Sequence, residues 1–134
     1  MDRVVDGDTI VVSLAGSHER VRLIGVDTPE TVDPHRPKGC YGKEASAFTK
    51  SLLHHGTGVR LVLDVEERDR YHRLLAYVYR TPDGTFVNAE LARGGYAKEL
   101  RIAPNTSHAG ELRALVESAR RDRRGLWGAC SGSG

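Results

Sequence analysis

Short apolar runs separated by turn sequences predict that much of the chain forms strands. Polar and apolar residues alternate in residues 19–23, and apolar residues take every second position in 59–65, which is the period of a half-buried strand. Asp6-Gly7-Asp8 and Pro82-Asp83-Gly84 are typical turn sequences. The predicted strands cover residues 4–5, 9–12, 19–26, 59–65 and 73–80, with a hairpin back to 86–87.

Three other segments have the apolar spacing of amphipathic helices. The predicted helices are residues 43–55, which Gly56 ends, a short helix from its N-cap Asn88 to 94–95, and a last helix that Ser107 caps and Gly125 follows. Residues 31–40 form an irregular loop that is longer than most connections, and loops of that length often carry function.

The order of these elements predicts a fold of the α+β class. Strands do not alternate regularly with helices, which disfavours a doubly wound parallel sheet. About five short strands, with a helix inserted between the third and the fourth, favour a five-stranded OB-type β-barrel with three helices.

The composition supports a folded protein but says little about its partner. Of 134 residues, 39% are apolar and 28% are charged, which is typical of a globular domain, and no apolar run approaches a membrane span. The net charge of +2 permits an anionic partner without requiring one. Sixteen of the 20 basic residues are arginine, which suits phosphate recognition but also follows from base composition.

Four carboxylates are candidates for a metal site. Asp6, Asp8 and Asp27 lie at predicted strand ends, and Glu30 follows shortly after. Carboxylates that converge repel one another unless a cation lies between them, and a set made only of oxygen ligands favours calcium or magnesium. Each motif by itself is equally compatible with an ordinary turn or strand exit, and the ligand pattern of an EF-hand is absent.

Two arginines on predicted strands, Arg22 and Arg73, complete a set that fits phosphodiester hydrolysis. A metal and guanidinium groups neutralise charge at the phosphorus, while a further carboxylate aligns or deprotonates water. The six histidines are scattered without the spacing of an acid–base pair, so a metal-free ribonuclease is disfavoured.

Several sequence blocks, taken together, resemble the staphylococcal-type thermonuclease (micrococcal nuclease) family over about residues 4–128. These blocks are residues 6–9, 22–31, 41–48, 69–77, 87–88 and 125–127. The resemblance implies a five-stranded barrel with three helices. It also implies a calcium-dependent nuclease that hydrolyses DNA and RNA and leaves 3′-phosphate ends.

The resemblance also implies roles for single residues. Asp8, Asp27 and the carbonyl of Thr28 match the calcium ligands, and Glu30 matches the residue that activates or positions water. The phosphate-clamping arginines correspond to Arg22 and Arg73, whereas Arg70 and Tyr71 correspond to a lysine and a tyrosine at the terminal phosphate of the nucleotide. Two tyrosines of the family prototype are absent from residues 98–104, where guanidinium stacking by Arg101 is a candidate replacement.

Cys40 and Cys130 are the only cysteines, and their spacing excludes a zinc site. They are either two thiols or one disulfide. We expect the disulfide because they flank predicted helix ends rather than core positions. A disulfide requires an oxidising compartment, so we expect a secreted protein whose leader is removed before Met1.

We therefore expect residues 1–130 to form one nuclease domain and residues 131–134 a flexible tail. The expected partners are DNA and RNA, preferably single-stranded or frayed, and we expect no membrane partner and a monomeric protein. The nucleic acid should be bound by a cluster around Arg22, Arg70 and Arg73, with help from Lys38. The alternatives are a catalytically inactive module of the same fold that binds nucleic acid or protein, and a structural calcium-binding domain.

Overall fold

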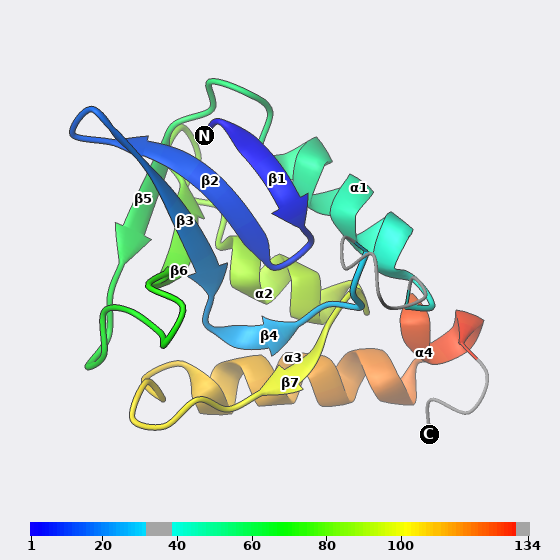
Figure 1. Ribbon diagram of the computed structural model, residues 1–134. Helices are drawn as coiled ribbons and strands as arrows, with labels where there is room; N and C mark the ends of the chain where they lie inside the picture. Colours follow the sequence, from blue (N-terminus) through cyan, green and yellow to red (C-terminus); the bar gives the residue numbers. More distant parts are fainter. Residues whose placement is uncertain (32–38, 131–134) are drawn as a thin grey trace.

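The computed structural model describes residues 1–31 and 39–130 and contains a five-stranded sheet, a two-stranded sheet and four helices (Figure 1). The strands are β1 (Arg3–Asp6), β2 (Thr9–Leu14), β3 (Ser17–Leu23), β4 (Gly25–Asp27), β5 (Val59–Val62), β6 (Leu74–Arg80) and β7 (Lys98–Leu100). The helices are α1 (Gly42–Leu52), α2 (Val87–Arg93), α3 (Ala109–Arg121) and the short α4 (Leu126–Ala129). The expected α+β class is thereby confirmed.

The large sheet has the strand order β1-β2-β3-β6-β5, and only β3 and β6 run parallel. Strands β1 and β5 are its two edges, so its hydrogen bonds do not close it into the barrel we expected. Main-chain bonds between Met1 and residues 56–57 instead join the start of β1 to the turn before β5. This open arrangement is consistent with the OB-type fold.

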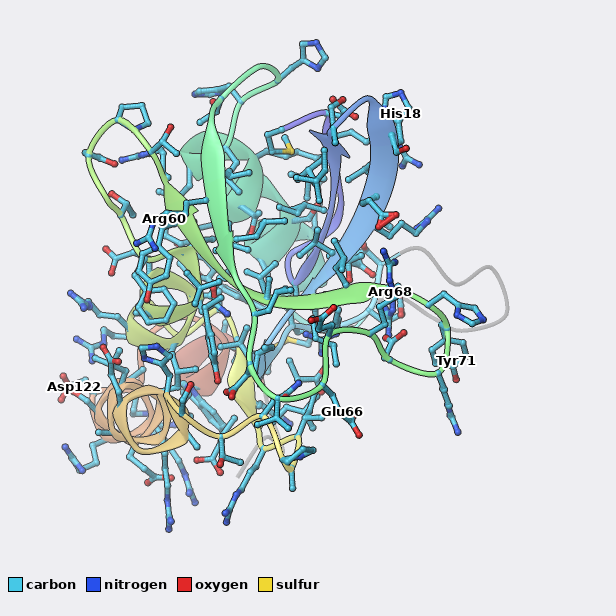
Figure 2. The ribbon with its side chains drawn as sticks, turned by 90° about the vertical axis from the view of Figure 1, so that its left-hand side faces the viewer. His18, Arg60, Glu66, Arg68, Tyr71 and Asp122 are labelled. Carbon is cyan, nitrogen blue, oxygen red and sulfur yellow. A yellow bond between two sulfur atoms is a disulfide. The ribbon has the colours of Figure 1, made fainter. Side chains whose placement is uncertain are left out.

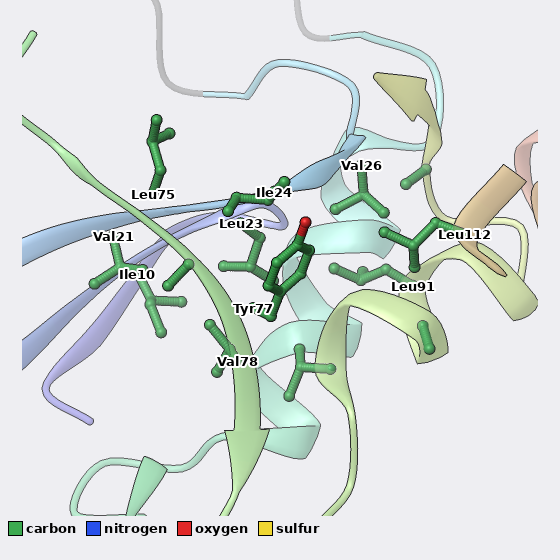
Figure 3. Packing of buried hydrophobic residues seen from close by; sticks show 14 of the residues in the cluster. Ile10, Val21, Leu23, Ile24, Val26, Leu75, Tyr77, Val78, Leu91 and Leu112 are labelled. Carbon is green, nitrogen blue, oxygen red and sulfur yellow. The ribbon is translucent and has the colours of Figure 1, made fainter. Parts of the chain in front are cut away.

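The core lies between the large sheet and helix α2, with α3 closing one end (Figure 3). Its largest members have under 2% of their surface exposed and come from strands and helices alike: Ile10, Leu23, Ile24, Leu75, Tyr77, Leu91 and Leu112. Burial of such side chains removes apolar surface from water, which is the main force that holds the sheet and the helices together. The strands that carry the candidate site are thus anchored in the core.

The predicted strand over residues 19–26 is in fact two strands, because the chain turns at Gly25. Gly25 has φ +87°, which L side chains rarely adopt, and a Cβ there would lie 2.4 Å from Leu112 Cδ1. The turn separates β4 from β3 and lets β4 pair with β7, a strand that the sequence patterns did not reveal. As a result Asp27 faces Lys98 across the small sheet.

Two predicted helix caps are wrong, and both residues have other tasks. Asn88 lies inside α2, where its side chain accepts a hydrogen bond from Val78 N and donates one to Ile24 O. Ser107 precedes His108, the N-cap of α3, and bonds through Oγ to Asp64. Both side chains satisfy polar groups of distant elements, so tertiary contacts outweigh their local capping preference.

Cys40 and Cys130 form a disulfide, with their Cα atoms 5.9 Å apart. The bond ties the residue before α1 to the end of α4. Within the described part of the chain, no helix has both the length and the apolar character needed to cross a membrane.

Candidate active site

Asp8 is buried at the turn between β1 and β2, and its side chain accepts hydrogen bonds from two neighbours. Its Oδ2 accepts a hydrogen bond of 2.9 Å from Thr28 N, and its Oδ1 accepts one of 3.0 Å from Thr9 Oγ1. Gly7 makes this turn possible, because a Cβ at that position would lie 2.9 Å from Thr28 Cγ2. The segment that follows β4 is therefore packed directly against the Asp-Gly-Asp turn.

Arg22 lies on β3 and joins this turn to the end of β4. Its Nη1 donates hydrogen bonds to the carbonyls of Leu23 and Val26, at 2.7 and 2.8 Å. Its Nη2 lies 3.3 Å from Asp8 Oδ2 and 3.4 Å from Asp27 Oδ1. The change of direction at Gly25 brings these carbonyls and Asp27 back toward Arg22, so a buried guanidinium bridges the two carboxylates predicted as metal ligands.

Asp6 and Glu30 meet beside this cluster through Thr31. The main-chain N of Thr31 donates to Asp6 Oδ1 at 3.2 Å and to Glu30 Oε1 at 3.0 Å, and Thr31 Oγ1 also bonds to Asp6. Burial raises the pKa of Asp6 to about 6, and the neighbouring carboxylates of Glu30 and Asp8 add to this effect. No sequence pattern indicated a role for Thr31, whose main-chain N bonds to Glu30.

The pKa of Asp27 is also raised, first by burial and then by the charges of Asp8 and Glu30, while Arg22 and Lys98 oppose the rise. Four acidic side chains thus influence one another in a small volume. Crowded carboxylates of this kind attract a cation, because each ionised group is destabilised by its neighbours.

A second group of candidate residues lies in the connection between β5 and β6 (Figure 2, where Tyr71 is labelled). Arg70 and Arg73 both approach the ring of Tyr71, with Cζ 4.9 and 5.4 Å from its centroid. Asp69 accepts hydrogen bonds from the main-chain N of Arg73 and from its Nε, at 3.0 and 2.7 Å. Within the described residues, this leaves the Nη atoms of Arg73 without a hydrogen-bond partner.

The structure therefore assembles the predicted residues as two groups rather than one. Arg22 contacts both Asp8 and Asp27, and Tyr71 is approached by both Arg70 and Arg73. In residues 1–31 and 39–130 no hydrogen bond or ion pair joins the groups, although Arg73 directly precedes Leu74, which pairs with Val21 on the Arg22 strand. The sequence predicted the members of both groups but not the supporting Asp69.

A pocket of about 260 Å³ adjoins Asp27. It is lined by Asp27, Thr28, Pro29, Gly39, Lys98, Leu126 and the disulfide between Cys40 and Cys130. Lys98 is a site residue that no sequence signal indicated, because its position depends on the pairing of β4 with β7. Arg101 lies beyond the end of β7 and is exposed, and Lys38 lies outside the described residues.

The donor set of the buried group fits a hard cation. Across residues 1–31 and 39–130, no three His, Cys, Asp or Glu side chains are placed so that they could hold a metal by themselves. The predicted set needs only two carboxylates, because a main-chain carbonyl is its third ligand. Among the described residues the buried Thr28 Oγ1 has no hydrogen-bond partner, and it is a further oxygen, on the residue whose main-chain N bonds to Asp8, that a hydrated cation would satisfy.

Comparison with known proteins gives consistent results. The family model described as "Staphylococcal nuclease homologue" matches residues 20–129. The chain is 42% identical to a thermonuclease of Staphylococcus hyicus over 93% of its length and 72% of the relative, and 47% identical to a thermonuclease of Staphylococcus intermedius over 90% and 67%. It is also 39% identical to endonuclease YncB of Bacillus subtilis (strain 168) over 95% of its length and 60% of the relative.

Proposed function

The chain belongs to the staphylococcal nuclease homologue family and is a nuclease, and from this premise we propose a calcium-dependent phosphodiesterase that cleaves DNA and RNA to 3′-phosphate products. The observation that carries the proposal is the bridge that buried Arg22 forms between Asp8 and Asp27. It places a guanidinium and two carboxylates at one point, with Glu30 held nearby through Thr31.

Asp8, Asp27 and the carbonyl of Thr28 are the residues that would hold calcium, which supplies positive charge to the phosphate when bound. Calcium accepts irregular shells of oxygen ligands better than magnesium does, and two carboxylates with one carbonyl form such a shell. The raised pKa values of Asp6 and Asp27 are consistent with this, because neighbouring carboxylates add to the effect of burial on both groups.

Glu30 is the residue that orients or deprotonates the attacking water. The water oxygen forms a bond to phosphorus, and its proton passes toward Glu30. The bond from phosphorus to the 5′ oxygen breaks, this oxygen takes up a proton from solvent water to become a hydroxyl, and the phosphate stays on the 3′ side. The hydrogen bond from Thr31 N to one carboxylate oxygen of Glu30, at 3.0 Å, fixes the position of this carboxylate.

The arginines neutralise charge that develops on the phosphoryl oxygens, which is where preorganised donors accelerate a reaction most. Arg22 is fixed by the carbonyls of Leu23 and Val26, and Arg73 is fixed through its Nε by Asp69. Arg70 and Tyr71 form an exposed contact for the next phosphate of the strand.

A strand must bring its phosphate to a buried guanidinium, so single-stranded or frayed nucleic acid is the expected substrate. We propose that residues 1–130 act as one nuclease domain and that the protein is a monomer. The bond between Cys40 and Cys130 supports a secreted protein, since disulfides persist in oxidising compartments.

The test is cleavage of heat-denatured DNA, followed on a gel, with calcium and with excess chelator. We expect cleavage with calcium, little with magnesium and none with chelator, and a loss of cleavage in Glu30→Gln with unchanged folding. Full activity in chelator would disprove the mechanism. DNA binding without cleavage would identify a catalytically inactive binding module. Calcium binding with neither DNA binding nor cleavage would identify a structural calcium-binding domain.

A further inference from the structure

The positive charge of this protein is concentrated in one part of the chain. Residues 98–124 contain seven basic and four acidic residues, whereas residues 1–97 contain thirteen basic and fourteen acidic residues. The excess therefore lies on Arg101 just after β7, on α3 and on the turn that follows α3. Figure 2 shows the end of α3, with Asp122 labelled, on the opposite side of the view from Tyr71. A local excess of this kind attracts a polyanion even when the net charge is small.

Beside this region two cations flank one half-buried aromatic ring, which packs against the core on its inner side. Lys98 Nζ lies 6.0 Å from the ring centroid of Trp127, and Arg120 Cζ lies 5.9 Å from it. Trp127 is only partly buried, and Lys98 and Arg120 are exposed. The acidic partner of Arg120 is Glu117, at 3.8 Å with both side chains about half exposed, so water and salt weaken that ion pair.

This cluster is continuous with the candidate active site. Lys98 pairs with Asp27 across the β4–β7 ladder and lines the same pocket as Asp27 and Leu126, the residue before Trp127. In Figure 1 the connection between β5 and β6 lies on one side of β4, and α4 lies on the other. A strand that contacts Arg70 and Tyr71 and is cleaved beside Asp27 would leave the site past Lys98.

We infer that Lys98, Trp127 and Arg120 form a second contact surface for the nucleic-acid strand, beyond the cleavage point. The two cations bind phosphates, and the indole ring stacks on a base, a combination that binds single strands with little sequence preference. This inference rests on the proposed nuclease function and extends it: the enzyme gains affinity for longer strands over very short ones.

The experiment compares two substrates in Arg120→Gln and in the double variant with Lys98→Gln. One substrate is a single-stranded oligonucleotide of about 16 nucleotides, within the range that such surfaces cover. The other is a thymidine bisphosphate nitrophenyl ester, which is too short to reach Trp127. Arg120→Gln is the cleaner variant, because Lys98 also faces Asp27.

We expect Arg120→Gln to raise KM for the oligonucleotide and to leave KM for the ester unchanged, and the double variant to raise KM for the oligonucleotide about tenfold. The salt dependence of oligonucleotide binding should become shallower by about 0.7 in log–log slope for each lost phosphate contact. Arg60→Gln is the matched control, since Arg60 also lies over an aromatic ring, with Cζ 4.6 Å from the centroid of Tyr79, but on β5. Arg60→Gln should leave KM unchanged for both substrates.

Trp127 provides a readout that does not depend on cleavage, because it is the only tryptophan. A stacked base should quench its fluorescence when the oligonucleotide is titrated into wild type in the presence of chelator. Equal effects on both substrates, an equal effect of Arg60→Gln, or no quenching would overturn the inference. Quenching without cleavage of either substrate by wild type would support this surface while disproving the proposed function.

Discussion

The two groups of site residues hold an arginine in opposite ways. Arg22 is 7% exposed and is fixed by two main-chain carbonyls and two carboxylates from three different segments. Arg73 is more exposed and is fixed by Asp69, from its own connection between β5 and β6. The difference teaches that Arg22 belongs to the folded framework as much as to the chemistry, whereas Arg73 can be removed without disturbing the fold.

Arg22→Ala is the substitution with the largest expected effect, and it tests whether Arg22 supports the fold. The substitution leaves buried Asp8 without its cation, and loss of one partner of a buried pair costs about 3–5 kcal/mol. We expect the free energy of unfolding to fall by about that amount and cleavage to be lost, as measured by urea denaturation and by the gel assay. A variant of unchanged stability would show that Arg22 has no framework role.

Arg73→Ala should lower turnover and leave stability almost unchanged. Loss of one preorganised charged donor raises the barrier by about 2.7–4 kcal/mol, which is about a hundred- to a thousandfold in rate. The measurement is kcat on denatured DNA together with the urea midpoint, with Arg60→Ala as a control for loss of an exposed arginine that lies over a tyrosine. A large fall in stability would contradict the comparison.

The disulfide stabilises the chain next to the group that contains Arg22. Gly39, which directly precedes Cys40, donates a hydrogen bond from its main-chain N to Glu30 O at 2.8 Å. Cys40→Ser with Cys130→Ser should lower the free energy of unfolding by about 2–4 kcal/mol. Thermal unfolding measures this loss, and mass spectrometry of the unreduced wild type verifies the bond. Two thiols that can be alkylated in the native protein would reject the disulfide and the argument for secretion.

Asp27→Ala tests the metal role with little disturbance of the fold, because the Asp27 side chain is 54% exposed. We expect the calcium concentration for half-maximal activity to rise at least about tenfold, since even indirect partners of a metal contribute that much. Calcium titration of cleavage measures it, with Asp83→Ala, an aspartate on a distant turn, as the control. An unchanged calcium requirement would remove Asp27 from the ligand set.

The smallest expected effect is the pH dependence of the Asp69–Arg73 pair. Partial burial favours a higher pKa of Asp69, but the hydrogen bonds and the charge of Arg73 outweigh it, so the pKa is lowered. The stabilisation is present above pH 4, and it is lost as the pH falls through the lowered pKa. Asp69→Asn should therefore destabilise by under about 1 kcal/mol at pH 6, and by progressively less as the pH falls below 4, as measured by urea denaturation.

Much of the local structure could be predicted from the sequence, because it depends on short-range periodicity. Apolar alternation in residues 19–23 and helical spacing over 43–55 correspond to β3 and α1, and the turn at Asp6-Gly7-Asp8 lies where its sequence predicts. Errors occurred where a side chain serves a distant element, as Asn88 does for Val78 and Ile24. A local rule cannot include a partner that lies far away along the chain.

The sequence by itself therefore determined which residues are candidates for the chemistry: the acidic turn, the Asp27–Glu30 segment and the two arginines. Only the tertiary structure decided how they are grouped, with Arg22 between Asp8 and Asp27 and Lys98 opposite Asp27. The physical reason is the turn at Gly25, whose backbone conformation separates β4 from β3 so that β4 pairs with β7. Side-chain identity is local information, whereas the distance between two charges depends on every element packed between them.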